Sequence, residues 1–375
     1  MYKIIVISAV LAFALSVSLI PAIIHACKKF CWYDSTNERK IHKGLIPRLG
    51  SVAFVPAAFI AAACFCIGYP ESRPLEYAPL AIGAFLIFVF GVVDDFKDLS
   101  ARKKLLVQII ASLLMVFSGK TFTTIGSFVL PAPLSGFLTF MWICGMINAF
   151  NLIDGVDGLC GGLSALVFAS LGIIYLHTNA TMAAFCFIIA AALGGFLVYN
   201  KPKACIFMGD GGSQFLGFMI AALPLYRSGS GFEVNKVFSM VLLTCIPVID
   251  TIAAMIRRRR AHRSFFSPDR AHLHHKLMNI GLSGVQILIL LLSVQAILCT
   301  VVCVSLLFDA FKAVMIMGAT WFIVLGAFCL LHYANRNALK NKEKSEAEGR
   351  SVEPLVLSAS LTPPPSDIIS YNKSK

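Results

Sequence analysis

Charged residues are scarce in this chain of 375 residues. Asp, Glu, Lys and Arg together make up 14% of it, whereas 58% of its residues are hydrophobic. A water-soluble domain of this length needs far more polar side chains to cover its surface, so the composition excludes that class. Apolar runs long enough to cross a bilayer recur along the whole chain. The sequence therefore predicts an all-α polytopic membrane protein.

Cysteine patterns typical of metal or disulfide sites are also missing. The twelve cysteines lie mostly inside the apolar runs, and no CxxC spacing occurs. This argues against a zinc ribbon and a disulfide framework, and we interpret the cysteines as small buried hydrophobic residues. The N-terminal apolar run lacks a small-residue cleavage site, so we expect it to be the first permanent span.

Eleven apolar segments are candidate membrane-spanning helices. They cover residues 4–26, 50–68, 78–93, 105–118, 128–150, 159–176, 181–199, 213–226, 236–256, 283–308 and 313–333. Segments 105–118 and 213–226 are short for a full span, and we expect one of them to be broken or tilted. We therefore predict ten or eleven spans in an integral membrane domain of residues 1–335, followed by a disordered tail of residues 336–375.

Lys and Arg are distributed unequally between the two sets of loops that eleven spans would separate. Most of the 32 basic residues fall on one side, which the positive-inside rule places in the cytoplasm. The N-terminus is then outside and the C-terminal tail is cytoplasmic. The net charge of +13 forms a cytoplasmic rim that suits anionic lipid head groups, and we expect no binding to nucleic acid.

Five polar motifs fall at the predicted cytoplasmic ends of these spans. They are KIHKGLIPRLGS (40–51), DDFKDLSARKK (94–104), NAFNLIDGVDGLCGG (148–162), FMGDGGSQFLG (207–217) and RRRRAHRSFFSPDRAHLHHKL (257–277). Unrelated loops would divide between the two faces of the membrane. The motifs therefore predict a single site at the boundary between membrane and cytoplasm.

Five aspartates in these motifs are the first candidates for chemistry: Asp94, Asp95, Asp154, Asp157 and Asp210. Each of them taken alone is better explained as a helix cap or a hydrated turn residue. Five acids on one face favour a shared site, because carboxylates near hydrocarbon are costly. Mg²⁺ is usually held by one or two carboxylates together with substrate phosphates.

Glycine-rich turns and basic side chains are candidate phosphate contacts. NLIDGVDGLCGG and FMGDGGSQFLG open directly into apolar helices, whose N-termini attract phosphate, although membrane helices also use Gly for close packing. Lys40, His42, Lys43 and Arg48 suit phosphate as well, with positive-inside topology as the alternative explanation.

Aromatic and histidine side chains complete the set of candidates. Phe207 offers a ring for a nucleotide base, unless it is an ordinary interfacial residue. His272, His274 and His275, together with Arg270, suit a pyrophosphate better than zinc, because no cysteine lies near them.

In this order, PRLG, DDFKDLS, NAFNLIDGVDGL, FMGDGGS and SPDRAHLHH closely resemble the polyprenyl-phosphate N-acetylhexosamine-1-phosphate transferases (glycosyltransferase family 4). The resemblance covers about residues 40–333, and SPDRAHLHH is similar to the N-acetylglucosamine branch. Two positions depart from the family pattern. Ser51 stands where the family commonly has Gly, and Gly211 where Ala or Val is commoner.

The resemblance implies an enzyme of the inner (plasma) membrane, active at its cytoplasmic face, that begins a cell-envelope polysaccharide pathway. It would transfer N-acetylglucosamine 1-phosphate from UDP-N-acetylglucosamine to undecaprenyl (polyprenyl) phosphate, releasing UMP, with Mg²⁺ or Mn²⁺ as cofactor. A donor of the phospho-N-acetylmuramoyl-pentapeptide type, or another UDP-N-acetylhexosamine, is the alternative within the family. The alternatives outside it are a membrane transporter of a phosphorylated solute and a non-catalytic lipid-binding protein. A homodimer is also expected.

The same resemblance implies roles for individual residues. Asp94 and Asp95 would orient or deprotonate the lipid phosphate, and Asp210 would bind the metal. The remaining candidates are His272, His274 and His275 for the pyrophosphate or leaving UMP, Phe207 for uracil, Asn151, Asp154 and Asp157 for the nucleotide or metal, and Lys43, Arg48 and Arg270 for phosphate. The sequence leaves open whether a phospho-aspartyl intermediate forms, and we expect direct attack by the lipid phosphate.

Overall fold

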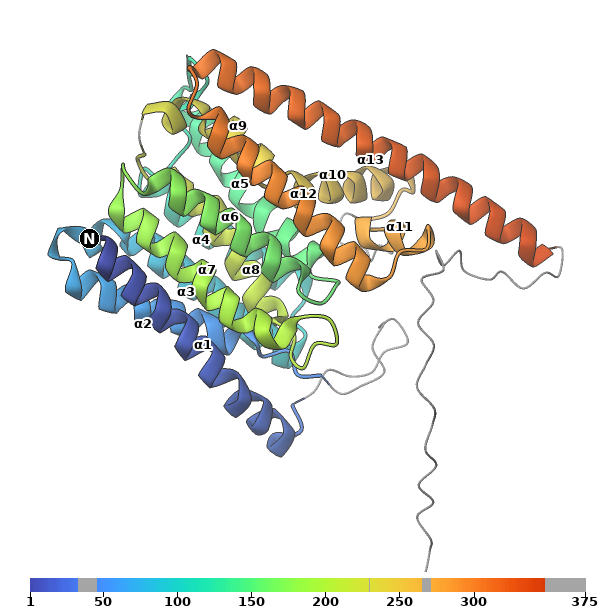
Figure 1. Ribbon diagram of the computed structural model, residues 1–375, viewed down its shortest axis with the longest axis horizontal. Helices are drawn as coiled ribbons and strands as arrows, with labels where there is room; N and C mark the ends of the chain where they lie inside the picture. Colours follow the sequence, from blue (N-terminus) through green and yellow to red (C-terminus); the bar gives the residue numbers. More distant parts are fainter. Residues whose placement is uncertain (33–45, 229, 265–270, 348–375) are drawn as a thin grey trace, which may run out of the picture.

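The computed structural model describes residues 1–32, 46–228, 230–264 and 271–347, and these residues are almost entirely helical (Figure 1). The helices are α1 (Tyr2–Phe30), α2 (Ser51–Gly68), α3 (Ala78–Lys97), α4 (Ala101–Phe117), α5 (Ala132–Ile153), α6 (Leu159–Tyr175), α7 (Ala180–Asn200), α8 (Gly209–Ala222), α9 (Ser230–Leu243), α10 (Cys245–Arg260), α11 (Leu273–Asn279), α12 (Gly284–Ser305) and α13 (Ala310–Ala347). The described strands are β1 (Thr124–Ile125) and β2 (Phe128–Val129), which form a small antiparallel hairpin between α4 and α5.

The predicted class, an all-α polytopic membrane protein, is confirmed. Within the described residues, seven helices are long and apolar enough to cross a bilayer: α1, α2, α3, α5, α7, α12 and α13. Helices α9 and α10 pass the same test only as a pair, and they are bent by 65° at the break between them. Counted as one broken span, they make an eighth. Fewer full spans are found than the ten or eleven predicted.

The three remaining predicted segments are helical but short. Helices α4 and α6 have 17 residues each, and α8 has 14. At 1.5 Å per residue α8 is about 21 Å long, which is less than the roughly 30 Å of a hydrocarbon core. The apolar segment 213–226 resembled a short membrane span because it is hydrophobic on all sides. In the structure, other helices surround α8, so its apolar side chains contact protein.

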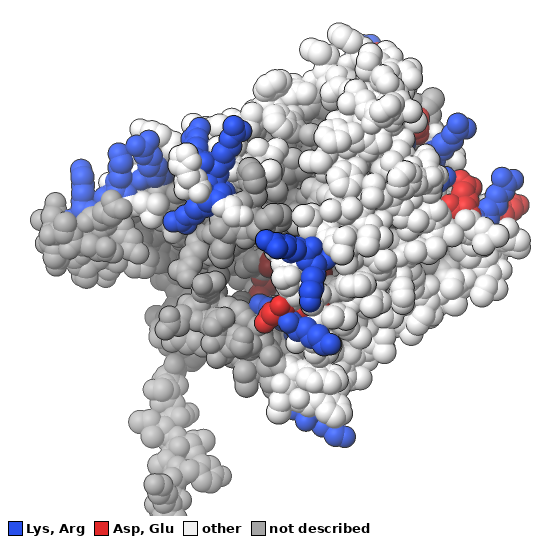
Figure 2. Space-filling view, turned by 180° about the vertical axis from the view of Figure 1, so that it is seen from behind, with Lys and Arg blue, Asp and Glu red and all other residues white. Residues whose placement is uncertain are grey.

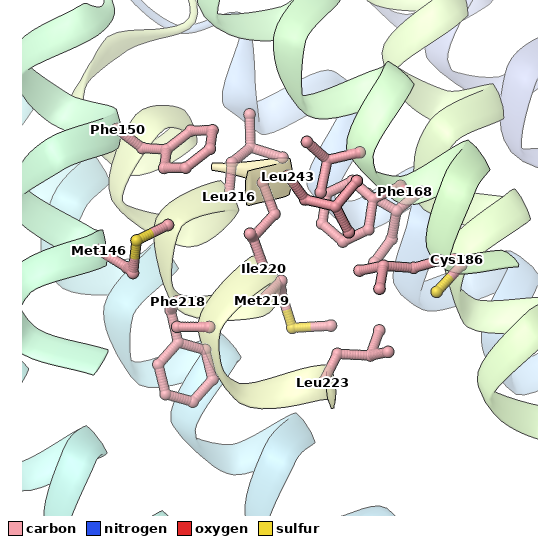
Figure 3. Packing of buried hydrophobic residues seen from close by; sticks show 14 of the residues in the cluster. Met146, Phe150, Phe168, Cys186, Leu216, Phe218, Met219, Ile220, Leu223 and Leu243 are labelled. Atoms are coloured by element: carbon pink, nitrogen blue, oxygen red, sulfur yellow. The ribbon is translucent and has the colours of Figure 1, made fainter. Parts of the chain in front are cut away.

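Helix α8 is the buried centre of the bundle. It packs against α3 and α5, with smaller contacts to α2 and α6. Figure 3 shows Leu216, Phe218 and Ile220 of α8 among side chains of the surrounding helices, including Phe150 of α5 and Phe168 of α6. Any polar group on α8 must therefore find its partners inside the protein.

Helices α3 and α8 touch through their backbones. A Cβ atom on Gly91 would lie 2.5 Å from the Gly211 Cα atom, so these glycines let the two helices approach without side chains between them. This contact brings the C-terminal end of α3, with its two aspartates, next to the N-terminal end of α8. It is the feature of the fold that assembles the site.

The last helix is unusually long. Helix α13 has 38 residues and continues to Ala347, so the predicted domain boundary at residue 335 falls inside it (Figure 1). The rest of the predicted tail, residues 348–375, lies outside the described residues. Helix α11 docks on α13, where Asn279 donates a hydrogen bond of 2.9 Å to Asn335 and the Lys276 Nζ lies 4.3 Å from the centre of the Phe328 ring.

Candidate active site

The described parts of the five motifs meet at one end of the bundle. The segment before α2 runs beside the segment before α8: Phe207 N donates to Pro47 O at 2.8 Å, and Gly50 N donates to Phe207 O at 2.9 Å. Gly209 has φ +73°, and a Cβ atom there would press on the Arg48 carbonyl and the Asp95 carboxylate. Figure 2 shows acidic side chains in and beside a hollow, with Lys and Arg side chains along part of its rim. The predicted convergence on one face is confirmed, whereas its cytoplasmic orientation stays a prediction.

Asp95 caps the N-terminus of α8. Its Oδ1 accepts a hydrogen bond of 2.7 Å from Asp210 N, and its Oδ2 accepts one of 3.1 Å from Gly211 N. The helix-cap interpretation, which we considered for any single aspartate, therefore applies to Asp95 across a helix interface. These two N–H groups bind a carboxylate of the protein, so they do not serve as the phosphate cradle that the glycine-rich turn suggested.

Asp94 and Asp210 share one ammonium group, that of Lys104. Asp94 is only 4% exposed; its Oδ1 accepts from Leu99 N at 2.6 Å, and its Oδ2 pairs with Lys104. The same Lys104 Nζ lies 2.8 Å from Asp210 Oδ2. A cationic group thus lies between two carboxylates from different helices. Sequence reasoning did not single out Lys104, although it ends the DDFKDLSARKK motif, because basic residues there are typical of membrane topology.

The carboxylates fit a magnesium ion that is shared with a substrate. Among the described residues no group of three His, Cys, Asp or Glu side chains is placed to hold a metal by itself. Mg²⁺ does not require one, since one or two carboxylates and substrate phosphates complete its shell. Asp94 and Asp210 supply hard oxygen ligands around a position that already attracts a cation. The donor set therefore suits Mg²⁺ bound together with a phosphate.

Asp154 and Arg48 adjoin this group. Burial raises the pKa of Asp154 to about 7; the negative charges of Asp210 and Asp157 also raise this pKa, and Arg48 lowers it. These charges act on Asp154, which directly follows α5. A cation bound near it would favour its ionised form, and its role in nucleotide or metal binding stays a prediction.

Asp157 binds the backbone of a neighbouring loop. Its Oδ2 accepts a hydrogen bond of 3.0 Å from Ala204 N. Nearby, Asn200 accepts from Gly158 N at 3.0 Å and donates to Ile206 O at 2.8 Å. Both side chains hold the segment between α7 and α8 against the start of α6. The role of Asp157 in nucleotide or metal binding stays a prediction.

Asn151 joins α5 to α8. Its side-chain oxygen accepts a hydrogen bond of 2.9 Å from Ser213 Oγ. Phe207 is half-buried just before α8, so part of its ring is accessible. Asn151 therefore contacts the first turns of α8, and Phe207 lies three residues before Asp210 in the chain; their roles in nucleotide binding stay predictions.

The histidines are anchored by an aspartate that sequence reasoning missed. His272 Nδ1 lies 3.0 Å from Asp250 Oδ2, and Leu273 N donates to Asp250 Oδ1 at 2.9 Å. Asp250 belongs to α10 and is 1% exposed. The signal was present, because a lone acid in an apolar run demands a partner. His272 and His274 stack at 6.0 Å between ring centres, and His274 and His275 are 4.3 Å apart.

His274 rests on the turn after α5. A Cβ atom on Gly155 would lie 2.6 Å from its Cε1 atom, so the HLHH motif contacts the IDGVDG motif directly. Burial, and the neighbouring His275 and His272, lower the pKa of His274 to about 4. A pKa this low favours the neutral form of His274 at pH 7, and its role at the pyrophosphate or the leaving UMP stays a prediction. Its Nδ1 is buried and has no hydrogen-bond partner among the described residues.

The remaining predicted contacts lie outside the described residues. They are Lys43 and Arg270, together with Lys40 and His42. Their roles in phosphate binding stay predictions.

Comparison with known proteins gives consistent matches. The family model described as Glycosyl transferase family 4 matches residues 77–228. A probable undecaprenyl-phosphate N-acetylglucosaminyl 1-phosphate transferase of Bacillus subtilis (strain 168) is 34% identical over 262 residues, which cover 67% of this chain and 70% of the relative. The undecaprenyl-phosphate alpha-N-acetylglucosaminyl 1-phosphate transferase of Escherichia coli (strain K12) is 32% identical over 287 residues, 73% of this chain and 76% of the relative. The protein of that name in Yersinia pestis is 33% identical over 278 residues, 71% and 74% respectively.

Proposed function

The chain belongs to glycosyl transferase family 4, and we propose that it transfers N-acetylglucosamine 1-phosphate from UDP-N-acetylglucosamine to undecaprenyl phosphate. The products are undecaprenyl-pyrophosphoryl-N-acetylglucosamine and UMP. An oxygen of the lipid phosphate attacks the phosphorus that carries the sugar. The bond between that phosphorus and the bridging oxygen breaks, and UMP leaves with the bridging oxygen.

The observation that carries this proposal is the group formed by Asp94, Lys104 and Asp210. Two carboxylates and one ammonium at the end of membrane helices suit a reaction between two phosphates, one of them on a lipid. Mg²⁺, when bound with the nucleotide, neutralises pyrophosphate charge and makes the sugar phosphorus more electrophilic. Asp94 and Asp210 would hold the Mg²⁺, and the ammonium of Lys104 would bind phosphate oxygens of the substrates.

The other residues position the reactants. Asp95 fixes the start of α8, and with it the backbone that carries Asp210. Asp154 and Arg48 adjoin the acids on the nucleotide side, and neutral His274 presents ring nitrogen for a hydrogen bond. Because Asp95 is engaged with two backbone N–H groups, it is a poor nucleophile. This supports direct attack by the lipid phosphate, and trapping of a labelled phospho-aspartyl enzyme would overturn that step.

The proposal includes the location. The site faces the cytoplasm of a plasma membrane, where nucleotide sugars are available, and the basic residues of that face follow the positive-inside rule. Single cysteines introduced at Ser100 or Arg73, in a variant whose native cysteines are replaced by Ser or Ala, test the orientation by their accessibility to a membrane-impermeant thiol reagent. Labelling of position 73 from outside whole cells, and of position 100 only after lysis, is expected. The reverse pattern would contradict it.

The decisive experiment uses purified protein in detergent with undecaprenyl phosphate and UDP-[¹⁴C]N-acetylglucosamine. Organic-extractable label that requires Mg²⁺, disappears with EDTA and is lost in Asp94→Asn and Asp210→Asn is the expected result. Label only from UDP-N-acetylmuramoyl-pentapeptide, or from another UDP-N-acetylhexosamine, would change the donor and keep the chemistry. No lipid product from any donor, with nucleotide-sugar exchange into liposomes, would indicate a transporter.

A further inference from the structure

Three amide side chains, two of them buried and that of Asn148 half-buried, form a line that ends on Asp210. Asn148 Nδ2 of α5 donates to Gln108 Oε1 of α4 at 2.7 Å, and Gln108 Nε2 donates to Gln214 Oε1 of α8 at 3.3 Å. Gln214 Nε2 then donates to Asp210 Oδ2 at 3.3 Å. Gln108 and Gln214 are 2% and 4% exposed. The line crosses three helices and reaches the carboxylate oxygen that Lys104 also contacts.

The direction of this line is determined by the carboxylate. An ionised carboxylate only accepts hydrogen bonds, so Gln214 must turn its NH₂ group toward Asp210 and its oxygen toward Gln108. Gln108 must then present its NH₂ group to Gln214 and its oxygen to Asn148. The second N–H of Asn148 binds Cys144 O at 2.7 Å, which completes the arrangement. Reversing any one amide would set two donors or two acceptors against each other.

Packing alone does not explain these amides. A leucine at position 108 or 214 would occupy a similar volume without the cost of burying an amide. Gln214 is also the last polar residue of α8, since only apolar residues and Gly217 follow it to Ala222. A line of donors polarises each successive amide, which strengthens the bond to the terminal charge.

We infer that Gln214, supported by Gln108 and Asn148, is a positioning residue that holds the Asp210 carboxylate in the orientation that binds the divalent cation. This inference rests on the proposed function only in assigning Asp210 to a cation. Gln214 contacts neither cation nor substrate directly. Side chains that orient a metal-binding carboxylate typically change metal affinity by 10-fold or more when they are removed.

The test compares the variants Gln214→Leu, Gln108→Leu and the double variant with wild type in detergent. The readout is Mn²⁺ binding followed by electron paramagnetic resonance, with Mn²⁺ alone and with UMP, so that catalysis is not required. Gln295→Leu is the matched control, because Gln295 is a buried glutamine of α12 that donates to Leu243 O at 2.8 Å, away from the acids. Any Mn²⁺ that still binds to the Asp210→Asn variant is bound without this carboxylate.

About 10-fold weaker Mn²⁺ binding is expected for Gln214→Leu and about 3-fold for Gln108→Leu. The double variant should be no weaker than Gln214→Leu, because Gln108 acts through Gln214. Gln295→Leu should lower the unfolding temperature and leave Mn²⁺ affinity unchanged. In turnover, half-saturating Mg²⁺ should rise in Gln214→Leu, while the KM for UDP-N-acetylglucosamine at saturating Mg²⁺ stays within 2-fold.

Three outcomes would overturn the inference. Gln214→Leu binds Mn²⁺ like wild type, or Gln295→Leu weakens Mn²⁺ binding equally, or wild type shows no Mn²⁺ binding that depends on Asp210. If wild type transfers no sugar phosphate yet binds Mn²⁺ through Asp210 in a Gln214-dependent manner, the proposed function fails and the positioning role stands.

Discussion

Both ends of the helix bundle contain partly buried charges, but the two groups are built differently. At the end opposite the site, Lys236 Nζ lies 2.8 Å from Glu233, and Lys120 Nζ lies 3.7 Å from Glu76. We call these four residues the paired cluster. Glu233 also accepts from Ser228 N at 3.1 Å and from Ser228 Oγ at 2.9 Å. Each acid there has its own base.

At the site end, acids outnumber the bases that act on them. Among the described residues, Asp94, Asp95, Asp154 and Asp210 lie together, and the cationic groups that act on them are Lys104 and Arg48. In the paired cluster, Glu233 and Lys236 lie within one turn of α9, and Glu233 ties that helix to Ser228 before it. Glu76 and Lys120 join the segment before α3 to the segment after α4. With more acids than bases among the described residues, the site end suits a cation from outside, as the proposed function requires. The ratio of acids to bases, rather than their burial, therefore distinguishes the candidate active site from the paired cluster.

The sharpest contrast is removal of one carboxylate at each end. Asp210→Asn is expected to lower transfer of labelled sugar phosphate to lipid by about 1000-fold, because it removes a charge that acts on the reacting phosphates. Glu233→Gln is the matched control at the paired cluster and should keep activity within about 2-fold. It should instead lower the free energy of unfolding by about 2 kcal/mol, since it leaves buried Lys236 without its carboxylate. Equal loss of activity in both variants would abolish the distinction.

Mg²⁺ should stabilise the protein only by binding at the site end of the bundle. At a Mg²⁺ concentration 100 times its dissociation constant, binding adds about 2.7 kcal/mol to the free energy of unfolding. Unfolding temperature, followed by intrinsic fluorescence, should therefore rise with Mg²⁺ in wild type and in Glu233→Gln. The rise should be absent in Asp210→Asn. A Mg²⁺ effect that survives Asp210→Asn would place the cation elsewhere.

A change from glycine to alanine should be tolerated at the end opposite the site, at position 231, and should destabilise the protein at the site end, at position 211. A Cβ atom at position 211 would lie 2.8 Å from Val92 Cγ2 and 2.9 Å from Ser51 Oγ, whereas one at Gly231 would find only Leu306 O, at 3.8 Å. Gly211→Ala is expected to cost about 2 kcal/mol by overpacking α3 against α8, and Gly231→Ala should be neutral or slightly stabilising. Chemical denaturation measures both variants. Equal stability of the two would show that α3 and α8 separate easily.

The smallest effect is expected at the exposed part of the paired cluster. Glu76→Gln removes a half-exposed ion pair and should change the free energy of unfolding by less than about 1 kcal/mol. Lys120→Gln also removes the ammonium that lies 4.3 Å from the centre of the Tyr226 ring, so its loss should be slightly larger. Neither change should alter transfer activity. A large loss of activity in either variant would show that the paired cluster also contributes to the reaction.

The meeting of the motifs was predictable from the sequence because alternate spans return polar ends to the same face. The fold class followed from the hydrophobic composition and from the length of the apolar segments. The number of full spans did not, since a helix enclosed by protein and a helix enclosed by lipid carry similar apolar side chains. Helix α8 is the example: apart from Asp210, Ser213 and Gln214 it has no polar side chain, and it is surrounded by other helices.

Side-chain partners within the site were less accessible to sequence reasoning. Whether Asp95 caps α8 or faces a phosphate depends on how α3 rotates and how closely it approaches, which the contact of Gly91 with Gly211 decides. Lys104 and Asp250 carried usable signals, a base close to paired acids and an acid inside an apolar run. Gln214 carried none, because its partners come from residues more than 100 positions away in the chain, apart from Asp210.

The contacts of position 211 link three parts of the chain in any redesign of this interface. Ser51 and Gly211 are the two departures from the family pattern. The Ser51 hydroxyl lies where a side chain at 211 would go and has no hydrogen-bond partner among the described residues. Replacing Ser51 by Gly would remove this contact, but Val92 Cγ2, at 2.8 Å, would still crowd a Cβ atom at 211. A design that restores the commoner residue at 211 therefore has to change position 51 and also widen the gap between α3 and α8.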